Sequence, residues 1–289
     1  ARAVIIKNVS IVAESDYSVN AVINNCDSTR KAEIDPDDFT TTSAGAVAGG
    51  IAGTVNRDEN ITDDTITMVF SGINFSRSAD REVNVARIEI NASTKDYSSS
   101  GAVYAGGAIG FIYSDGSEYI GKDFVTSGET KDTAVMEYIF ECPVDVTAVQ
   151  NGVGPAYAGG TFGYNCFNIG DEDDRSVNIA IVAPEYDYTV TAVQSATSST
   201  VNDKDGYNSA YNVCAGGYTP RLQFGYTAKN IEFEIGSGRI IAYREVGSTA
   251  VGDVNAGGFA GRALSTAAAV SSLNGYDENP VQRGTIDNF

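Results

Sequence analysis

The stretch AYAGGTFGY, residues 156–164, carries the motif that recurs most regularly along this chain of 289 residues. Three close copies are AGGIAG (48–53), AGGAIG (105–110) and AGGFAG (256–261), and a looser copy, AGGYTPRLQFG, begins at Ala215. The alanines of successive copies lie 57, 53, 57 and 41 residues apart. Five copies at such spacings predict a repeat protein, whose units stack and bury their apolar faces against one another.

Each copy is preceded by a short segment in which apolar and polar residues alternate. The five segments are VSIVA (9–13), IEINA (88–92), VDVTA (144–148), YTVTA (188–192) and RIIAY (239–243). A period of two is typical of a β-strand with one buried face. We therefore expect the alanines that these segments share to stack inside the fold: Ala13, Ala92, Ala148, Ala192 and Ala242.

A third kind of segment, also strand-like, comes before each of these. The five are AVIIK (3–7), TITMVF (65–70), AVMEYIF (134–140), SVNIAIV (176–182) and NIEFEI (230–235). The sequence thus predicts an all-β fold, a β-solenoid of about five three-stranded rungs with long inserted loops. The whole chain is one repetitive domain, with units at approximately 1–56, 57–113, 114–166, 167–226 and 227–289. A sandwich or a propeller is the alternative, although propeller blades have four strands.

The glycine pair of the motif marks a place where the backbone passes close to another part of the chain. Glycine permits a sharp bend there, and the bulky residue that follows can fill the interior. A phosphate-binding loop is the functional alternative. It fits poorly, because the spacing is GGxxG and not GxGxxG and no helix is predicted after it.

The four regular copies resemble the GLUG motif, a short glycine-framed repeat of bacterial surface adhesins and other large secreted proteins with β-helical stalks. The copy AGGYTPRLQFG departs from that pattern. The resemblance implies an extracellular or cell-surface location, repetitive β-structure and adhesive or structural work. It implies no catalytic residue, because the motif has none.

Composition excludes several classes of function. The formal net charge of −19 opposes nucleic-acid binding, which requires clusters of lysine and arginine. No apolar run is long enough for membrane insertion as a helix. Histidine is absent, which removes the Ser-His-Asp and Cys-His arrangements, so we expect no enzyme of those types. Paired carboxylates remain open as a catalytic chemistry.

Several residues are candidates for modification or for metal binding. Glycosylation is predicted at the asparagines of four Asn-x-Ser/Thr triplets, namely Asn8, Asn60, Asn74 and Asn91. The four cysteines, Cys26, Cys142, Cys166 and Cys214, permit three disulfide connectivities, and buried thiols are an equal alternative. The segment NDKDGYN (202–208) is similar to a calcium loop, with Asp203, Asp205 and Asn208 as candidate ligands. A solvated turn is the favoured interpretation of this segment. Calcium is the only cofactor that the sequence suggests.

Two classes of function fit these observations. The first is a non-enzymatic extracellular structural protein, a subunit or segment of a surface fibre, filament or adhesin stalk. Its partner is itself in a head-to-tail homopolymer, or adjoining repeats of a longer chain. The second is a carbohydrate-binding or carbohydrate-cleaving β-helix protein, with glycans as partners. The second class requires two acidic residues at equivalent positions of adjacent rungs, and the alignment of the strands shows the outward acids only at scattered places.

Overall fold

The computed structural model describes residues 3–23, 46–56, 67–77, 87–95, 102–113, 119–120, 135–151, 154–165, 168–169, 176–195, 212–223, 227–245, 253–264 and 285–287. These residues form an all-β fold in which every strand pairing is parallel. No helix occurs among them. The strands of the first half are β1 (Ala3–Ala13), β2 (Tyr17–Ile23), β3 (Ala46–Gly49), β4 (Ala52–Asn56), β5 (Thr67–Arg77), β6 (Ile88–Thr94), β7 (Val103–Gly106), β8 (Ile109–Tyr113), β9 (Tyr119–Ile120) and β10 (Val135–Glu141). Those of the second half are β11 (Val144–Gln150), β12 (Ala156–Gly159), β13 (Asn168–Ile169), β14 (Ser176–Gln194), β15 (Val213–Gly216), β16 (Thr219–Gln223), β17 (Thr227–Arg244), β18 (Val254–Gly257), β19 (Ala260–Leu264) and β20 (Thr285–Asp287).

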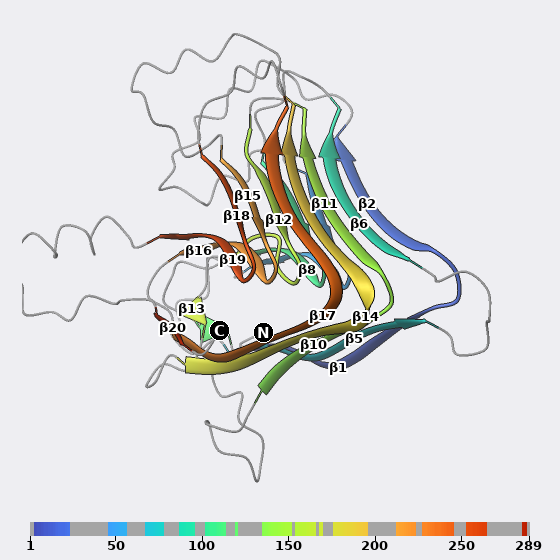
Figure 1. The fold of residues 1–289 in the computed structure, drawn as a ribbon, viewed down its shortest axis with the longest axis vertical. Helices are drawn as coiled ribbons and strands as arrows, with labels where there is room; N and C mark the ends of the chain where they lie inside the picture. The colour runs from blue at the N-terminus through green and yellow to red at the C-terminus, as the bar shows by residue number, and fades with distance from the viewer. Residues whose placement is uncertain are drawn as a thin grey trace, which may run out of the picture.

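The largest sheet has 11 strands and contains two series of equivalent strands. One series consists of β1, β5, β10 and the first halves of β14 and β17, and the other of β2, β6, β11 and the second halves of β14 and β17. Figure 1 shows β14 and β17 running through the bend that joins the two series. Their pairing shifts register at this bend, between Ala183 and Asp187.

The Ala-Gly-Gly segments form a second sheet, of five strands, in the order β18-β15-β12-β7-β3. After four of the five glycine pairs the chain turns and continues as a further short strand, which gives the pairs β4–β8 and β16–β19. After β12 the described residues form isolated bridges instead, from Phe162 to Ile109 and from Asn165 to Ile112. Figure 1 shows this turn where β15 and β18 give way to β16 and β19. The motif therefore contributes two strands in these units where the sequence predicted one.

Equivalent residues of successive units lie beside one another in columns. Ala92, Ala148, Ala192 and Ala242 form one such column, as expected. The first member is wrong, because Ala13 pairs with Arg77 at the end of β1 and Ala21 takes its place beside Ala92. The segments AVIIK and VSIVA, expected as two strands, are both part of β1.

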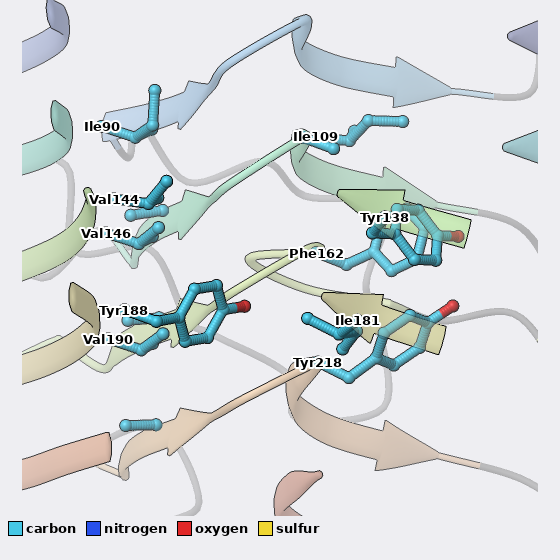
Figure 2. Close-up of a cluster of buried hydrophobic side chains, with 14 of the residues drawn as sticks. Ile90, Ile109, Tyr138, Val144, Val146, Phe162, Ile181, Tyr188, Val190 and Tyr218 are labelled. Carbon is cyan, nitrogen blue, oxygen red and sulfur yellow. The ribbon is translucent and has the colours of Figure 1, made fainter. Parts of the chain in front are cut away.

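The core lies between the 11-stranded sheet and the sheets made by the Ala-Gly-Gly motif. Figure 2 shows Ile90, Val146 and Val190 stacked from successive strands on one side, facing Ile109, Phe162 and Tyr218 from the other. Phe162 and Tyr218 meet edge to face with ring centroids 5.2 Å apart. The buried hydroxyl of Tyr188 donates to the carbonyl of Gly217 at 2.7 Å, which satisfies both groups.

The glycine pair is required by close approach of the backbone. A Cβ added at the second glycine of a pair would meet the carbonyl oxygen of the second glycine of the next unit, and this holds at Gly50, Gly107, Gly160 and Gly217. A Cβ at the first glycine would meet the carbonyl oxygen three residues further along its own unit, as at Gly106 with Ile109. The prediction of close packing at this motif is thus confirmed, and the approach occurs both within and between units.

Candidate assembly interface

The two ends of the stack differ from its middle in the burial of inward-facing residues. Ile90, Val146 and Val190 are completely buried in the middle units. Val19 and Ile240, which occupy the same column in the first and last units, are only partly buried. Among the described residues, β2 and the second half of β17 have a strand partner on one side only, as do β3 and β18. Apolar interior and unpaired strand edges therefore meet at both ends along these strands, whereas the first half of β17 is covered by β20 at Thr227–Lys229.

Apolar side chains are exposed on these end strands. Val22 on β2 and Tyr243 on β17 each expose 43% of their surface, and they belong to one column of the sheet. Val254 on β18 exposes 43%, whereas Val213 beside it is fully buried. Exposed apolar residues that gather on an open strand edge are typical of a surface that binds another chain.

Charged residues on the outer face of the sheet meet in a diagonal arrangement. Arg87, which precedes β6, forms an ion pair with Asp145, which lies on the next strand and two residues further along. Glu89 lies directly opposite Asp145. The arginine thus offsets the repulsion between two carboxylates in adjacent positions. Two outward acids, taken as scattered in the sequence, are thus adjacent on neighbouring strands.

A buried polar column closes one edge of the core. Thr94, Gln150 and Gln194 follow one another in the sheet and are completely buried. The hydroxyl of Thr94 donates to Gln150 Oε1, and Gln194 Nε2 donates to the carbonyl of Gly154 at 2.8 Å. At the last unit Arg244 Nε donates to Gln194 Oε1 at 2.8 Å, and burial lowers the pKa of this guanidinium.

A second cluster of aromatic residues lies on the outer face of the Ala-Gly-Gly sheet. Tyr104 and Tyr157 stack with ring centroids 5.5 Å apart before the glycine turn, and Phe111 and Tyr164 stack at 5.3 Å after it. Tyr104 meets Phe111 across the turn at 4.9 Å. Arg221 covers the Tyr164 ring and donates to its hydroxyl at 3.2 Å. Because Val103 and Ala105 point into the main core, alternation places Tyr104 on the opposite face. This cluster holds the two arms of the turn together.

Burial also sets the ionisation of this second cluster. Desolvation raises the pKa of Tyr157 to about 12, and the nearby guanidinium of Arg221 partly opposes the shift. Desolvation likewise raises the pKa of the Cys214 thiol to about 11, against a hydrogen bond from Asn255 Nδ2. Both groups are therefore neutral at physiological pH, as expected of residues that pack and do not react.

The structure places three of the four predicted glycosylation sites on the outward face. Asn8 is exposed, with a left-handed φ of 56°, and it faces Gly72 on β5, whose φ is 63°. Asn74 and Asn91 are half-buried, and Asn91 Nδ2 donates to Asn20 Oδ1 at 3.1 Å. Asn60 lies outside the described residues.

The cysteines and the calcium candidates are described only in part. Cys142 and Cys214 are buried thiols in different clusters, and Cys142 Sγ lies 3.6 Å from the carbonyl oxygen of Phe75. Five candidates lie outside the described residues, namely Cys26, Cys166, Asp203, Asp205 and Asn208. Within the described part of the chain, no group of three or more cysteine or carboxylate side chains is placed to hold a metal ion.

Comparisons with known proteins return no relative. No family model, no curated protein and no solved structure matches this chain. No helix in the described residues is long and apolar enough to cross a membrane.

Proposed function

We propose that this chain is a β-solenoid and a non-enzymatic extracellular structural protein, the subunit of a surface fibre, filament or adhesin stalk that assembles head to tail. The resemblance of the four regular glycine motifs to the GLUG motif supports the extracellular location. The abundance of alternating β-segments and the absence of histidine support structural work over catalysis.

The pairing of equivalent strands supports the solenoid. Each Ala-Gly-Gly strand pairs with its counterpart 41–57 residues along the chain, always in parallel and with alanine beside alanine. The same order of units appears in the columns of the 11-stranded sheet. A coil that rises by one strand per unit produces this pattern.

The observation that carries the filament is the difference in burial along the inward columns. In the columns that contain Ile90 and Ala92, the inward residues are fully buried in the middle units and partly exposed in the first and last ones. A further rung at each end would cover them, as each unit covers its neighbour inside the molecule. That rung comes from a second copy or from adjoining repeats of a longer chain, and we propose the second copy. Such a heterologous contact does not close on itself and gives filaments.

Sedimentation velocity and negative-stain microscopy of the purified chain test this proposal. We expect particles that lengthen with protein concentration while keeping a constant width. A monodisperse monomer at millimolar concentration would contradict the filament and favour adjoining repeats as the partner.

The carbohydrate-active alternative has one observation in its favour, the adjacent carboxylates of Glu89 and Asp145. Asp145 is engaged by Arg87, and both acids lie on the outer face of the sheet. Incubation with a panel of acidic and neutral polysaccharides tests this alternative. New reducing or unsaturated ends that disappear in the Glu89→Gln variant would favour it over the structural role.

A further inference from the structure

We infer the register of the contact between two copies: the second half of β17 pairs in parallel with β2 of the next copy, and β18 pairs with β3. In this register Ala242 lies beside Ala21, and Gly257 lies beside Gly49 of the next copy. The inference rests on the proposed head-to-tail assembly and specifies its partner surface.

The columns inside the molecule define this register. The inward column Ala21, Ala92, Ala148, Ala192 and Ala242 would continue with Ala21 of the next copy. The Ala-Gly-Gly column ends at Ala256 and Gly257 and would continue with Ala48 and Gly49. A shift by one residue would turn every inward side chain of the incoming strand outward. The apolar pattern of both sheets therefore selects the same alignment.

The inferred register brings apolar side chains of the two copies together at the junction. Tyr243 and Val22 are exposed in the isolated chain, and in this register they become direct neighbours on one face. Gly238 ends the inward column that begins with Tyr17. The Cδ1 of Ile235 lies 2.4 Å from where a Cβ of Gly238 would be, so the incoming Tyr17 ring would pack on the Ile235 side chain.

The charges at the junction have opposite sign. Asp16 and Arg239 are both exposed. Arg239 would lie opposite Ser18, two residues beyond Asp16 on the incoming chain. The offset is two residues, as it is between the ion-paired Arg87 and Asp145, although it runs in the opposite direction along the strands.

Two terminal glycines lack the backbone neighbour that their equivalents have. A Cβ at Gly217 would meet the carbonyl oxygen of Gly258, the second glycine of the next motif. Gly258 is the equivalent of Gly217 in the last unit, and it is exposed. At the other end, a Cβ at Gly110 would meet the carbonyl oxygens of Ala48 and Gly53 in the preceding unit, at 2.6 and 2.7 Å. Gly53 is the equivalent in the first unit, and a Cβ there would meet only the carbonyl of Val47, at 3.4 Å. In the inferred contact, the next copy supplies the missing neighbour of Gly258, and the preceding copy supplies that of Gly53.

Alanine at these two positions provides a complementation test. Gly258→Ala should keep the wild-type melting temperature and prevent the last unit from contacting the next copy. Gly53→Ala should also keep the melting temperature and prevent the first unit from contacting the preceding copy. Each variant alone should stay monomeric in sedimentation velocity. An equimolar mixture should give dimers and nothing longer, because each dimer joins one intact first unit to one intact last unit. Glu137→Ala, an exposed change in a middle unit, is the control and should form filaments like wild type.

Disulfide trapping then reads the register directly. Copies with Asn20→Cys are mixed with copies with Ile241→Cys, oxidised mildly and mapped by mass spectrometry under non-reducing conditions. We expect a crosslink between residues 20 and 241, because directly opposed strand positions are within disulfide range. Asn20→Cys with Glu245→Cys, four residues further along and just past the end of β17, is the mismatched control and should give none.

The outcomes separate this inference from the proposed function. Wild-type filaments without the 20–241 crosslink, or filaments formed by the Gly258→Ala variant alone, would overturn the register and leave the filament standing. A crosslink between two copies of residue 20 would show head-to-head contact and overturn the polarity. Wild-type protein that never assembles would overturn both.

Discussion

Replacing Gly107 with alanine tests whether close backbone approach explains the repeated motif. A Cβ built at this position lies 1.9 Å from the carbonyl oxygen of Gly160 in the next unit. The carbonyl carbon of Gly160 is also close, at 3.0 Å, whereas the nearest side-chain atom, the Cγ2 of Val146, is at an ordinary 3.6 Å. The clash is therefore with the backbone, which cannot rotate away as a flexible side chain would.

The cost follows from the hydrogen bonds that the clash would break. Ordinary contact begins near 3.4 Å, so the two units must separate locally by about 1.5 Å. That separation would break the bonds from the amide of Gly107 to the carbonyl of Gly159, now 3.1 Å, and from Ala108 to Thr161, now 2.9 Å. Each buried hydrogen bond that breaks costs about 1–3 kcal/mol. Alanine also lowers the conformational entropy of the unfolded chain, which stabilises the fold by about 0.4–1 kcal/mol. We expect a net loss of about 2–5 kcal/mol in the free energy of unfolding.

Urea unfolding followed by circular dichroism measures this change, with Gly53→Ala as the matched control. Gly53 belongs to the same motif, but a Cβ there meets only ordinary contact, so the control should be neutral or slightly stabilising. The assay is run at a concentration where neither variant assembles. Equal stability of the Gly107→Ala variant and wild type would refute the close-approach explanation.

Three further predictions concern the core and the outer face. Ala148→Leu should cost about 1–3 kcal/mol in urea unfolding because Ala148 is completely buried, whereas Ala21→Leu at the half-buried first unit should cost less; equal costs would contradict the column. Asn8→Ala should lose about 1–2 kcal/mol and Asn8→Gly almost nothing, because φ is 56° there; a neutral alanine in the same assay would contradict the left-handed geometry. Burial raises the pKa of Cys214 to about 11 and that of Tyr157 to about 12. Above about pH 9 the unfolded chain loses protons that the folded chain retains, so the free energy of unfolding present at pH 8 should fall as the pH rises. Unfolding midpoints from pH 8 to 11 measure that fall, which Cys214→Ala should make shallower; an unchanged slope would argue against the buried thiol.

The sequence predicted the stacking of equivalent strands well where the motif is unambiguous. The Ala-Gly-Gly copies pair as expected. Only glycine fits where two backbones approach closely, so the glycine pair recurs in every copy and identifies the equivalent strands. The first unit was misassigned because two alternating segments there contain an alanine, at Ala13 and at Ala21. The choice depends on Asn8 and Gly72, whose paired left-handed conformations let β1 continue past residue 8. Local alternation carries no information about that pairing.

The second aromatic cluster was missed, although the sequence contains a signal for it. Tyr104 and Tyr157 both precede the alanine of an Ala-Gly-Gly motif, and alternation then requires them to face away from the core. Their burial could not be predicted, because Phe111 and Tyr164 reach them only after the chain has turned at the glycine pair. The adjacency of Glu89 and Asp145, in contrast, follows from the alignment of Ala92 with Ala148, which the sequence predicted.

The axial rise per subunit in assembled filaments tests the central claim most directly. Five units stacked at about 4.8 Å, continued without a gap into the next copy, give a rise of about 24 Å per chain. Helical reconstruction of filaments by cryo-electron microscopy measures this value. A rise near 24 Å, with β17 of one copy beside β2 of the next, is the result that we predict. A rise that is not close to five strand spacings, or copies joined through the outer faces of their sheets, would contradict the account.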